Sequence, residues 1–126
     1  MSIDQQKKSG IIRIIRAFFY SIEGFKSAFV SEAAFRQELL LFIILLPAAI
    51  FLPVTVIEKL ILIACLFVVL IVELLNSAVE STIDLITQEF HPLAKKAKDI
   101  ASAAVLLSLI MTLVIWGVVI YRLLFR

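Results

Sequence analysis

The chain has 126 residues, of which 63% are hydrophobic, and it carries a formal net charge of +2. This length allows one domain, and this apolar content excludes an ordinary soluble protein of the same size. The basic residues do not cluster among aromatic residues, so we expect no nucleic-acid partner.

The chain begins with a polar tail over residues 1–10, which has neither the apolar core nor the cleavage site of a signal peptide and is expected to be retained. Residues 11–30 then alternate apolar and charged side chains at helical spacing. A basic helix with an aromatic apolar face is typical of one that lies in the membrane interface. Packing on the protein's own core is the alternative reading of this helix.

Three apolar stretches follow, at Leu39–Ile57, Leu60–Val72 and Ile100–Tyr121, and none contains a charged residue. Each approaches the roughly 20 residues that cross about 30 Å of hydrocarbon. We therefore predict an all-α membrane protein formed by a single domain over residues 1–126, with an N-terminal amphipathic interfacial helix and three transmembrane helices. The helices that carry the spans are predicted at about 32–52, 59–84 and 93–122.

Local signals refine these boundaries. Ser31 is predicted to cap the first span helix, because its hydroxyl can accept a hydrogen bond from a free backbone N–H. Glu58 and Lys59 are expected in a polar turn before the second helix. Pro92 suits the first turn of the third helix. Trp116 is expected at the far membrane interface, as is Tyr121.

Basic residues predict the orientation of the spans. The N-terminal arm and the loop before the third span share one side of the membrane and hold nine lysines and arginines, against three on the other side. The nine are Lys7, Lys8, Arg13, Arg16, Lys26, Arg36, Lys95, Lys96 and Lys98, and the three are Lys59, Arg122 and Arg126. This excess places the arm and the lysine-rich loop in the cytoplasm.

A polar stripe interrupts the second apolar stretch. Glu73, Asn76, Glu80 and Asp84 recur at helical spacing and share one face. Ionisable residues inside a membrane segment are costly and usually face a protein interior or a water-filled site. This stripe is therefore the leading candidate for a functional site.

The acidic residues near the cytoplasmic side suggest phosphoryl transfer. Glu32 and Glu80 can bind Mg²⁺, which prefers oxygen ligands and often retains phosphates and waters. Lys98 and an arginine of the arm can neutralise phosphate oxygens. Glu73 lies about 10 Å deeper than Glu80 along the helix and can take a proton from a lipid hydroxyl. Together these groups suit transfer from a nucleotide to a lipid alcohol.

Two alternatives remain open on spacing alone, because the sequence has no glycine-rich phosphate loop. The stripe could be the site of a small proton- or cation-coupled exporter. It could also hold helices together, since Asn76 and Ser77 form hydrogen bonds well across membrane helices.

Three segments resemble the prokaryotic diacylglycerol kinase family. They are EAAFRQE at Glu32–Glu38, ELLNSAVE at Glu73–Glu80 followed by Asp84, and AKDIASAAV at Ala97–Val105. The resemblance implies a homotrimer with active sites between subunits, ATP and Mg²⁺ as partners, and diacylglycerol as the lipid substrate. One departure is Phe90, which stands where the family resemblance leads us to expect tyrosine.

The resemblance also implies residue roles. Glu73 would be the general base, supported by Asn76, and Glu32 and Glu80 would bind the metal. The residues implied to bind ATP are Arg13, Tyr20, Glu32, Glu80, Glu89, Phe90, His91, Lys98 and Asp99. The residues implied to bind the lipid are Arg13, Gln37, Glu38, Glu73 and Ser102.

We therefore expect an ATP- and Mg²⁺-dependent kinase that makes phosphatidic acid from 1,2-diacylglycerol at the cytoplasmic face of a bacterial inner membrane. Undecaprenol kinase is the alternative enzyme, since no feature of the sequence excludes a polyprenyl alcohol. A small proton-coupled transporter is the alternative that is not a kinase.

Overall fold

The structure, a computed structural model, describes residues 10–126. Its four helices are α2 (Gly10–Ser31), α3 (Ala33–Phe51), α4 (Val56–Ile86) and α5 (Pro92–Leu124). The described part of the chain is therefore all-helical, as predicted, and the predicted polar tail lies almost wholly outside it. The chain divides into two compact units, Met1–Glu32 and Ala33–Arg126.

The first unit contains α2. Its bounds match the predicted amphipathic helix to within one residue. Large apolar side chains on it are exposed, among them Ile11, Ile14 and Phe18. An exposed apolar surface of this kind suits a lipid interface, and the placement of α2 in the interface stays a prediction.

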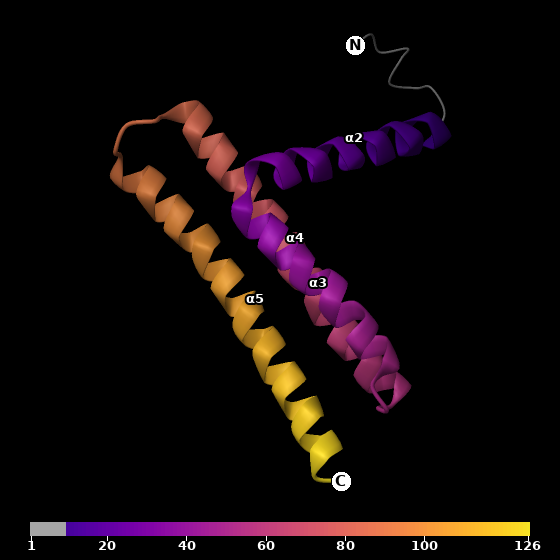
Figure 1. Ribbon diagram of the computed structural model, residues 1–126. Helices are drawn as coiled ribbons and strands as arrows, with labels where there is room; N and C mark the ends of the chain where they lie inside the picture. The colour runs from indigo at the N-terminus through magenta and orange to yellow at the C-terminus, as the bar shows by residue number, and fades with distance from the viewer. Residues whose placement is uncertain (1–9) are drawn as a thin grey trace. The chain divides into compact units, whose positions relative to one another are not determined.

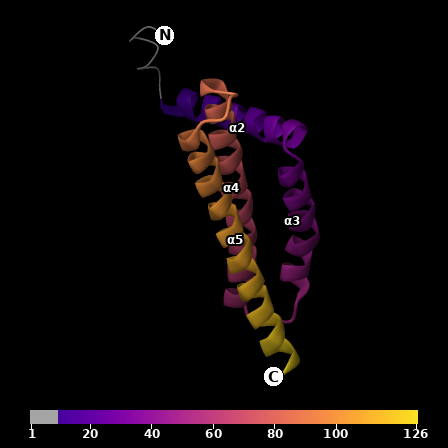
Figure 2. The ribbon, with the colours of Figure 1, turned by 90° about the vertical axis from the view of Figure 1, so that its left-hand side faces the viewer.

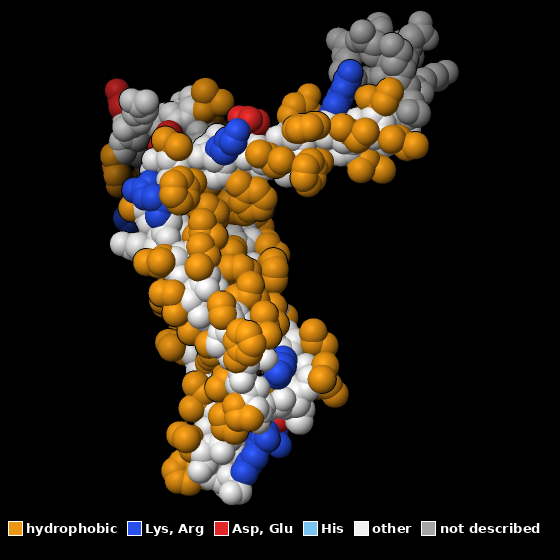
Figure 3. All heavy atoms as spheres, turned by 45° about the vertical axis from the view of Figure 1, so that its right-hand side comes forward, with side chains coloured by type: hydrophobic (Ala, Val, Ile, Leu, Met, Phe, Trp, Pro, Cys, Tyr) orange, Lys and Arg blue, Asp and Glu red, His pale blue; other side chains and the backbone are white. Residues whose placement is uncertain are grey.

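The second unit is a bundle in which α4 packs against both α3 and α5 (Figures 1 and 2). All three helices are long and apolar enough to span a membrane, in agreement with the three predicted spans. Hydrophobic side chains cover much of the face shown in Figure 3. With 31 and 33 residues, α4 and α5 are each longer than hydrocarbon requires. At about 1.5 Å per residue they extend well beyond 30 Å, so their connected ends can project into water.

The observed starts of α3 and α4 differ from two predictions made from the sequence. Ser31 is the last residue of α2, and its hydroxyl donates to the carbonyl of Ser27 at 2.8 Å, so it does not cap α3. α4 begins at Val56, earlier than predicted, because Thr55 caps it by accepting from the backbone N–H of Glu58 at 3.1 Å. A threonine followed three residues later by glutamate is a helix-start pattern that the prediction overlooked.

The apolar core of the bundle lies toward the α3–α4 connection. Its buried residues are Ala49, Leu62, Cys65, Leu66, Trp116 and Val119. Trp116 is only 9% exposed and belongs to this core, and its place at the membrane interface stays a prediction. Its indole packs against α4 because burial of so large an apolar ring outweighs the need of its N–H for a partner. Tyr121, by contrast, is exposed and contacts Phe125.

Candidate active site

The polar stripe of α4 lies inside the second unit. Glu73 is 3% exposed, and Asn76 and Glu80 are half-buried. The amide nitrogen of Asn76 donates to a carboxylate oxygen of Glu80 at 3.4 Å. The stripe thus runs from a buried carboxylate to a partly accessible one, and Asn76 orients the latter.

α3 brings a second acidic residue to this stripe. Glu38 is half-buried and lies within electrostatic range of Glu73 on α4. One of its carboxylate oxygens is buried and has no hydrogen-bond partner within residues 10–126. Gln37 and Ser102, the other predicted lipid-side residues of this unit, are exposed. Of the predicted lipid-binding set, Glu38 and Glu73 are therefore the pair that the structure brings together.

A groove of about 400 Å³ lies where α4 ends and α5 begins. Residues of both helices and of the loop that joins them line this groove. They are Ile83, Asp84, Thr87, Gln88, Glu89, Phe90, His91, Ala94, Lys95, Lys98 and Asp99. Five predicted nucleotide-binding residues, Glu89, Phe90, His91, Lys98 and Asp99, thus border one hollow.

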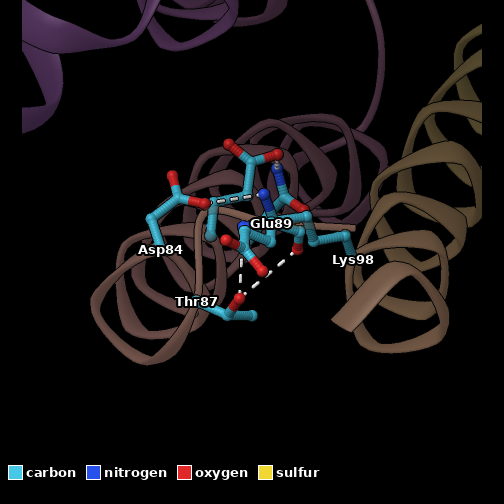
Figure 4. A network of polar contacts seen from close by, with 6 residues as sticks. Asp84, Thr87, Glu89 and Lys98 are labelled. Carbon is cyan, nitrogen blue, oxygen red and sulfur yellow. Dashed lines mark hydrogen bonds and ion pairs between the residues drawn. The ribbon is translucent and has the colours of Figure 1, made fainter. Parts of the chain in front are cut away.

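Two lysine–aspartate pairs dominate the charge in this groove. The ammonium of Lys98 lies 2.7 Å from a carboxylate oxygen of Asp84, which ties α5 to α4 (Figure 4). The ammonium of Lys95 lies 2.5 Å from a carboxylate oxygen of Asp99, one turn along α5. Glu80 lies within electrostatic range of Lys98. The groove and the polar stripe of α4 are therefore connected through Glu80.

The connecting loop is shaped by its own side chains. Thr87 ends α4, and its hydroxyl accepts from the backbone N–H of Glu89 at 3.2 Å (Figure 4). His91 caps α5, with Nδ1 accepting from the backbone N–H of Leu93 at 3.1 Å. Pro92 follows in the first turn, as predicted. Because Nδ1 accepts, the neutral imidazole carries its proton on Nε2 and can offer that N–H to a ligand.

Arg13, Tyr20 and Glu32 belong to the first unit. Arg13 and Tyr20 lie on α2 and are exposed. Glu32 stands between α2 and α3, and its backbone N–H donates to the carbonyl of Ala28 at 2.9 Å. Their contribution to a site in the second unit stays a prediction.

The acidic residues suit a metal that retains other ligands. Within residues 10–126, no group of three or more histidine, cysteine, aspartate or glutamate side chains is arranged to hold a metal ion. Glu80 has oxygen lone pairs beyond the one that accepts from Asn76. One or two carboxylates completed by phosphates and waters form a usual site for Mg²⁺. The residues present therefore fit a Mg²⁺ ion that arrives with a nucleotide.

Sequence reasoning missed the roles of two charged residues of the groove. Asp84 was the last member of the stripe but had no predicted partner, and Lys95 had no predicted role in the site. The spacing of Lys95 and Asp99, four residues apart on one helix, could have indicated their pair. The Asp84–Lys98 pair could not be read from spacing, because it depends on how α4 and α5 pack.

Comparisons with known proteins agree with the resemblance noted from the motifs. A family model described as prokaryotic diacylglycerol kinase matches residues 19–120. A protein named diacylglycerol kinase from Pseudomonas aeruginosa is 46% identical over 112 residues, covering 89% of this chain and 91% of the relative. The protein of that name from Helicobacter pylori is 45% identical over 111 residues, covering 88% and 87%. The one from Escherichia coli K12 is 41% identical over 113 residues, covering 90% and 93%.

Proposed function

The chain belongs to the prokaryotic diacylglycerol kinase family, and on that premise we propose that it transfers the γ-phosphoryl group of ATP to the free hydroxyl of 1,2-diacylglycerol. The product is phosphatidic acid. The reaction takes place at the cytoplasmic face of the bacterial inner membrane, where ATP arrives from water and the lipid from the bilayer. The N-terminus lies on the same side.

The position of Glu80 is the observation that best supports this proposal. Glu80 accepts from Asn76 in the polar stripe and lies within electrostatic range of Lys98 in the groove. A nucleotide in the groove would place its phosphates near Lys98, at the end of α4 that carries Glu80. Glu73 lies about 10 Å further along the same helix, toward the lipid.

Each residue then has a defined task. Glu73, which is buried, accepts the proton of the lipid hydroxyl as that oxygen attacks phosphorus. Asn76 holds Glu80 in place through its amide. Lys98 stabilises the negative charge of the phosphoryl oxygens by electrostatic attraction. Because phosphoryl transfer needs mainly positioning and charge stabilisation, these groups supply what the reaction requires.

Glu32 and Glu80 would hold Mg²⁺ that enters with ATP as part of the substrate. When bound, the metal ion neutralises charge on the β- and γ-phosphoryl oxygens. Arg13 and Tyr20 would border the nucleotide from α2, and Glu89, Phe90, His91 and Asp99 from the groove. A histidine with Nε2–H available suits a ribose oxygen of the nucleoside.

The lipid side of the site would be formed by Gln37, Glu38 and Ser102, with Arg13 at the membrane surface. The carboxylate oxygen of Glu38 that lacks a partner within residues 10–126 suits a hydroxyl of the glycerol backbone. The active enzyme is a homotrimer with sites between subunits, a proposal drawn from the family resemblance. Mass measurement of the protein in detergent would test this assembly.

Phosphate transfer from radiolabelled ATP in mixed micelles tests the reaction, with diacylglycerol and undecaprenol supplied in parallel. We expect strong Mg²⁺-dependent labelling of diacylglycerol. Preferential labelling of undecaprenol would retain the phosphoryl-transfer chemistry but refute the proposed substrate. No labelling of either lipid by folded protein would refute the kinase proposal and favour a transporter.

A further inference from the structure

The geometry points to Lys95 as a second phosphate-binding residue of the groove, directed at the part of the triphosphate nearer to the nucleoside. This inference rests on the proposed function, since it takes the groove as the nucleotide site. No motif singled out Lys95, and its neighbour Lys96 carries the same charge. What distinguishes the two lysines is the face of α5 that each occupies.

Lys95 lies on the face of α5 that borders the groove. His91, Ala94, Lys95 and Lys98 all line the groove, and their spacing of three and four residues places them on one helix face. Lys96, the next residue, is rotated by about 100° around the helix axis and does not line the groove. Lys95 and Lys96 both border a second hollow along α5, but only Lys95 also lines the groove.

The ion pair with Asp99 directs Lys95 along this face. The two charged groups lie 2.5 Å apart, and both side chains remain more than half exposed. The ammonium has three donors, so two remain for a ligand while one stays with Asp99. Lys98 is held in the same way by Asp84 at 2.7 Å. The groove thus presents two ammonium groups, each held by its own carboxylate.

The order of residues along α5 indicates which phosphates each lysine meets. His91, at the helix start, is proposed to contact the nucleoside, and Lys98 is proposed to contact the transferred end. Lys95 lies about 6 Å from His91 and about 4.5 Å from Lys98 along the helix axis. A triphosphate laid along this face therefore passes Lys95 before it reaches Lys98.

Charge balance supports a cationic role for Lys95. Apart from the two lysines, the charged side chains that line the groove are Asp84, Glu89 and Asp99, all acidic. Without Lys95, one lysine would face three carboxylates; with Lys95, two lysines face three, so the excess negative charge of the lining falls from two to one. Lys95 thus reduces the repulsion of a polyphosphate and adds donors for phosphate oxygen.

Lys95→Gln is the central test, because glutamine removes the charge and keeps a long side chain with similar helix propensity. Lys96→Gln is the matched control, with the same change one position along. We expect Lys95→Gln to raise the KM for ATP about three- to tenfold, which is the range for a partly exposed charged contact. Both kcat and the KM for diacylglycerol should stay within about twofold of the wild-type values. Lys96→Gln should leave all three within twofold, and Lys95→Arg should restore the KM for ATP.

Competition assays locate the contact on the nucleotide. ADP and adenosine serve as the two competitors of ATP, and only ADP carries phosphates. Lys95→Gln should raise the inhibition constant of ADP about as much as the KM for ATP and leave that of adenosine unchanged. An equal rise for adenosine, or equal effects of the two lysine variants, would overturn the role of Lys95. A large fall in kcat would also overturn it, by showing that the Lys95–Asp99 pair is structural.

Direct binding of Mg²⁺-ATP to the purified protein in micelles separates this inference from the proposed function. If wild-type protein binds ATP without labelling any lipid, the proposed reaction fails, and the binding of ATP by Lys95→Gln and Lys96→Gln still tests Lys95. If wild-type protein labels diacylglycerol and both variants bind ATP as it does, only the inference about Lys95 fails. If wild-type protein binds no ATP, both are wrong.

Discussion

Lys98 and Asp84 form an ion pair at 2.7 Å across the junction of α4 and α5, although fourteen positions separate them in the chain. The pair connects the last turns of α4 to the second turn of α5 and forms one wall of the groove. The packing of α4 against α5 therefore helps to set the position of Lys98, which is proposed to bind phosphate.

We expect substitution of Lys98 to impair the reaction much more than substitution of Asp84. Lys98→Gln removes the proposed phosphate contact and should lower kcat/KM for ATP at least 100-fold. Asp84→Asn leaves the Lys98 ammonium in the groove but removes the carboxylate that holds it in place. We therefore expect a two- to fivefold rise in the KM for ATP. Both side chains of the pair are substantially exposed, so thermal stability should change little. Steady-state kinetics with varied ATP would check this, and equal losses in the two variants would contradict it.

Glu73 is buried in α4 and is the proposed base. Glu73→Gln keeps the size of the side chain and removes its ability to take a proton. We expect phosphoryl transfer to fall more than about 1,000-fold while Mg²⁺-ATP binding stays within threefold. Transfer assays and equilibrium binding on the same preparation would measure both. Loss of ATP binding in parallel would show that Glu73 supports the fold of the site and is not the base.

Glu80 is half-buried and accepts from Asn76 at 3.4 Å. If it binds Mg²⁺, then Glu80→Gln should raise the Mg²⁺ concentration needed for half-maximal activity about tenfold or more, because an anionic ligand becomes neutral. The KM for diacylglycerol should stay within twofold. A Mg²⁺ titration at saturating lipid would measure this. An unchanged Mg²⁺ requirement would argue against a ligand role.

The sequence predicted the helices well because their signals are local. Uncharged apolar runs identified the three helices that are long and apolar enough to span a membrane, and Pro92 marked the start of α5. The start of α4 was missed although Thr55 and Glu58 carried a local capping pattern. The burial of Trp116 was not predicted, because it depends on the packing of α5 on the other helices and not on a local signal.

The candidate site shows the same contrast between what local sequence indicates and what depends on helix packing. Glu89, Phe90, His91, Lys98 and Asp99 were predicted together from the resemblance, and the structure places them around one groove. The proximity of Glu38 and Glu73 depends on how α3 packs on α4, and no spacing in the chain encodes that. Ion pairs across helices are hidden from sequence reasoning because many acidic and basic residues could form them.

At the other end of the bundle, Glu58 provides a prediction about stability. It is 8% exposed, and one guanidinium nitrogen of Arg126 donates to both of its carboxylate oxygens at 2.8 and 3.0 Å. Glu58 also stands in the first turn of α4, where a negative charge favours the helix dipole. Glu58→Gln loses both effects and leaves the arginine without its anionic partner. We expect it to lower stability by about 1 to 3 kcal/mol, since the pair is only partly exposed to water.

Thermal unfolding in detergent would measure this loss, and activity below the transition should remain within twofold of wild type because Glu58 is far along α4 from Glu73 and Glu80. Arg126→Gln is the matched variant. It should destabilise less than Glu58→Gln, because the carboxylate that remains keeps its interaction with the start of the helix. Equal stability of Glu58→Gln and wild type would contradict a stabilising role for the pair. A selective rise in the KM for ATP in Glu58→Gln would show that the two ends of α4 are coupled.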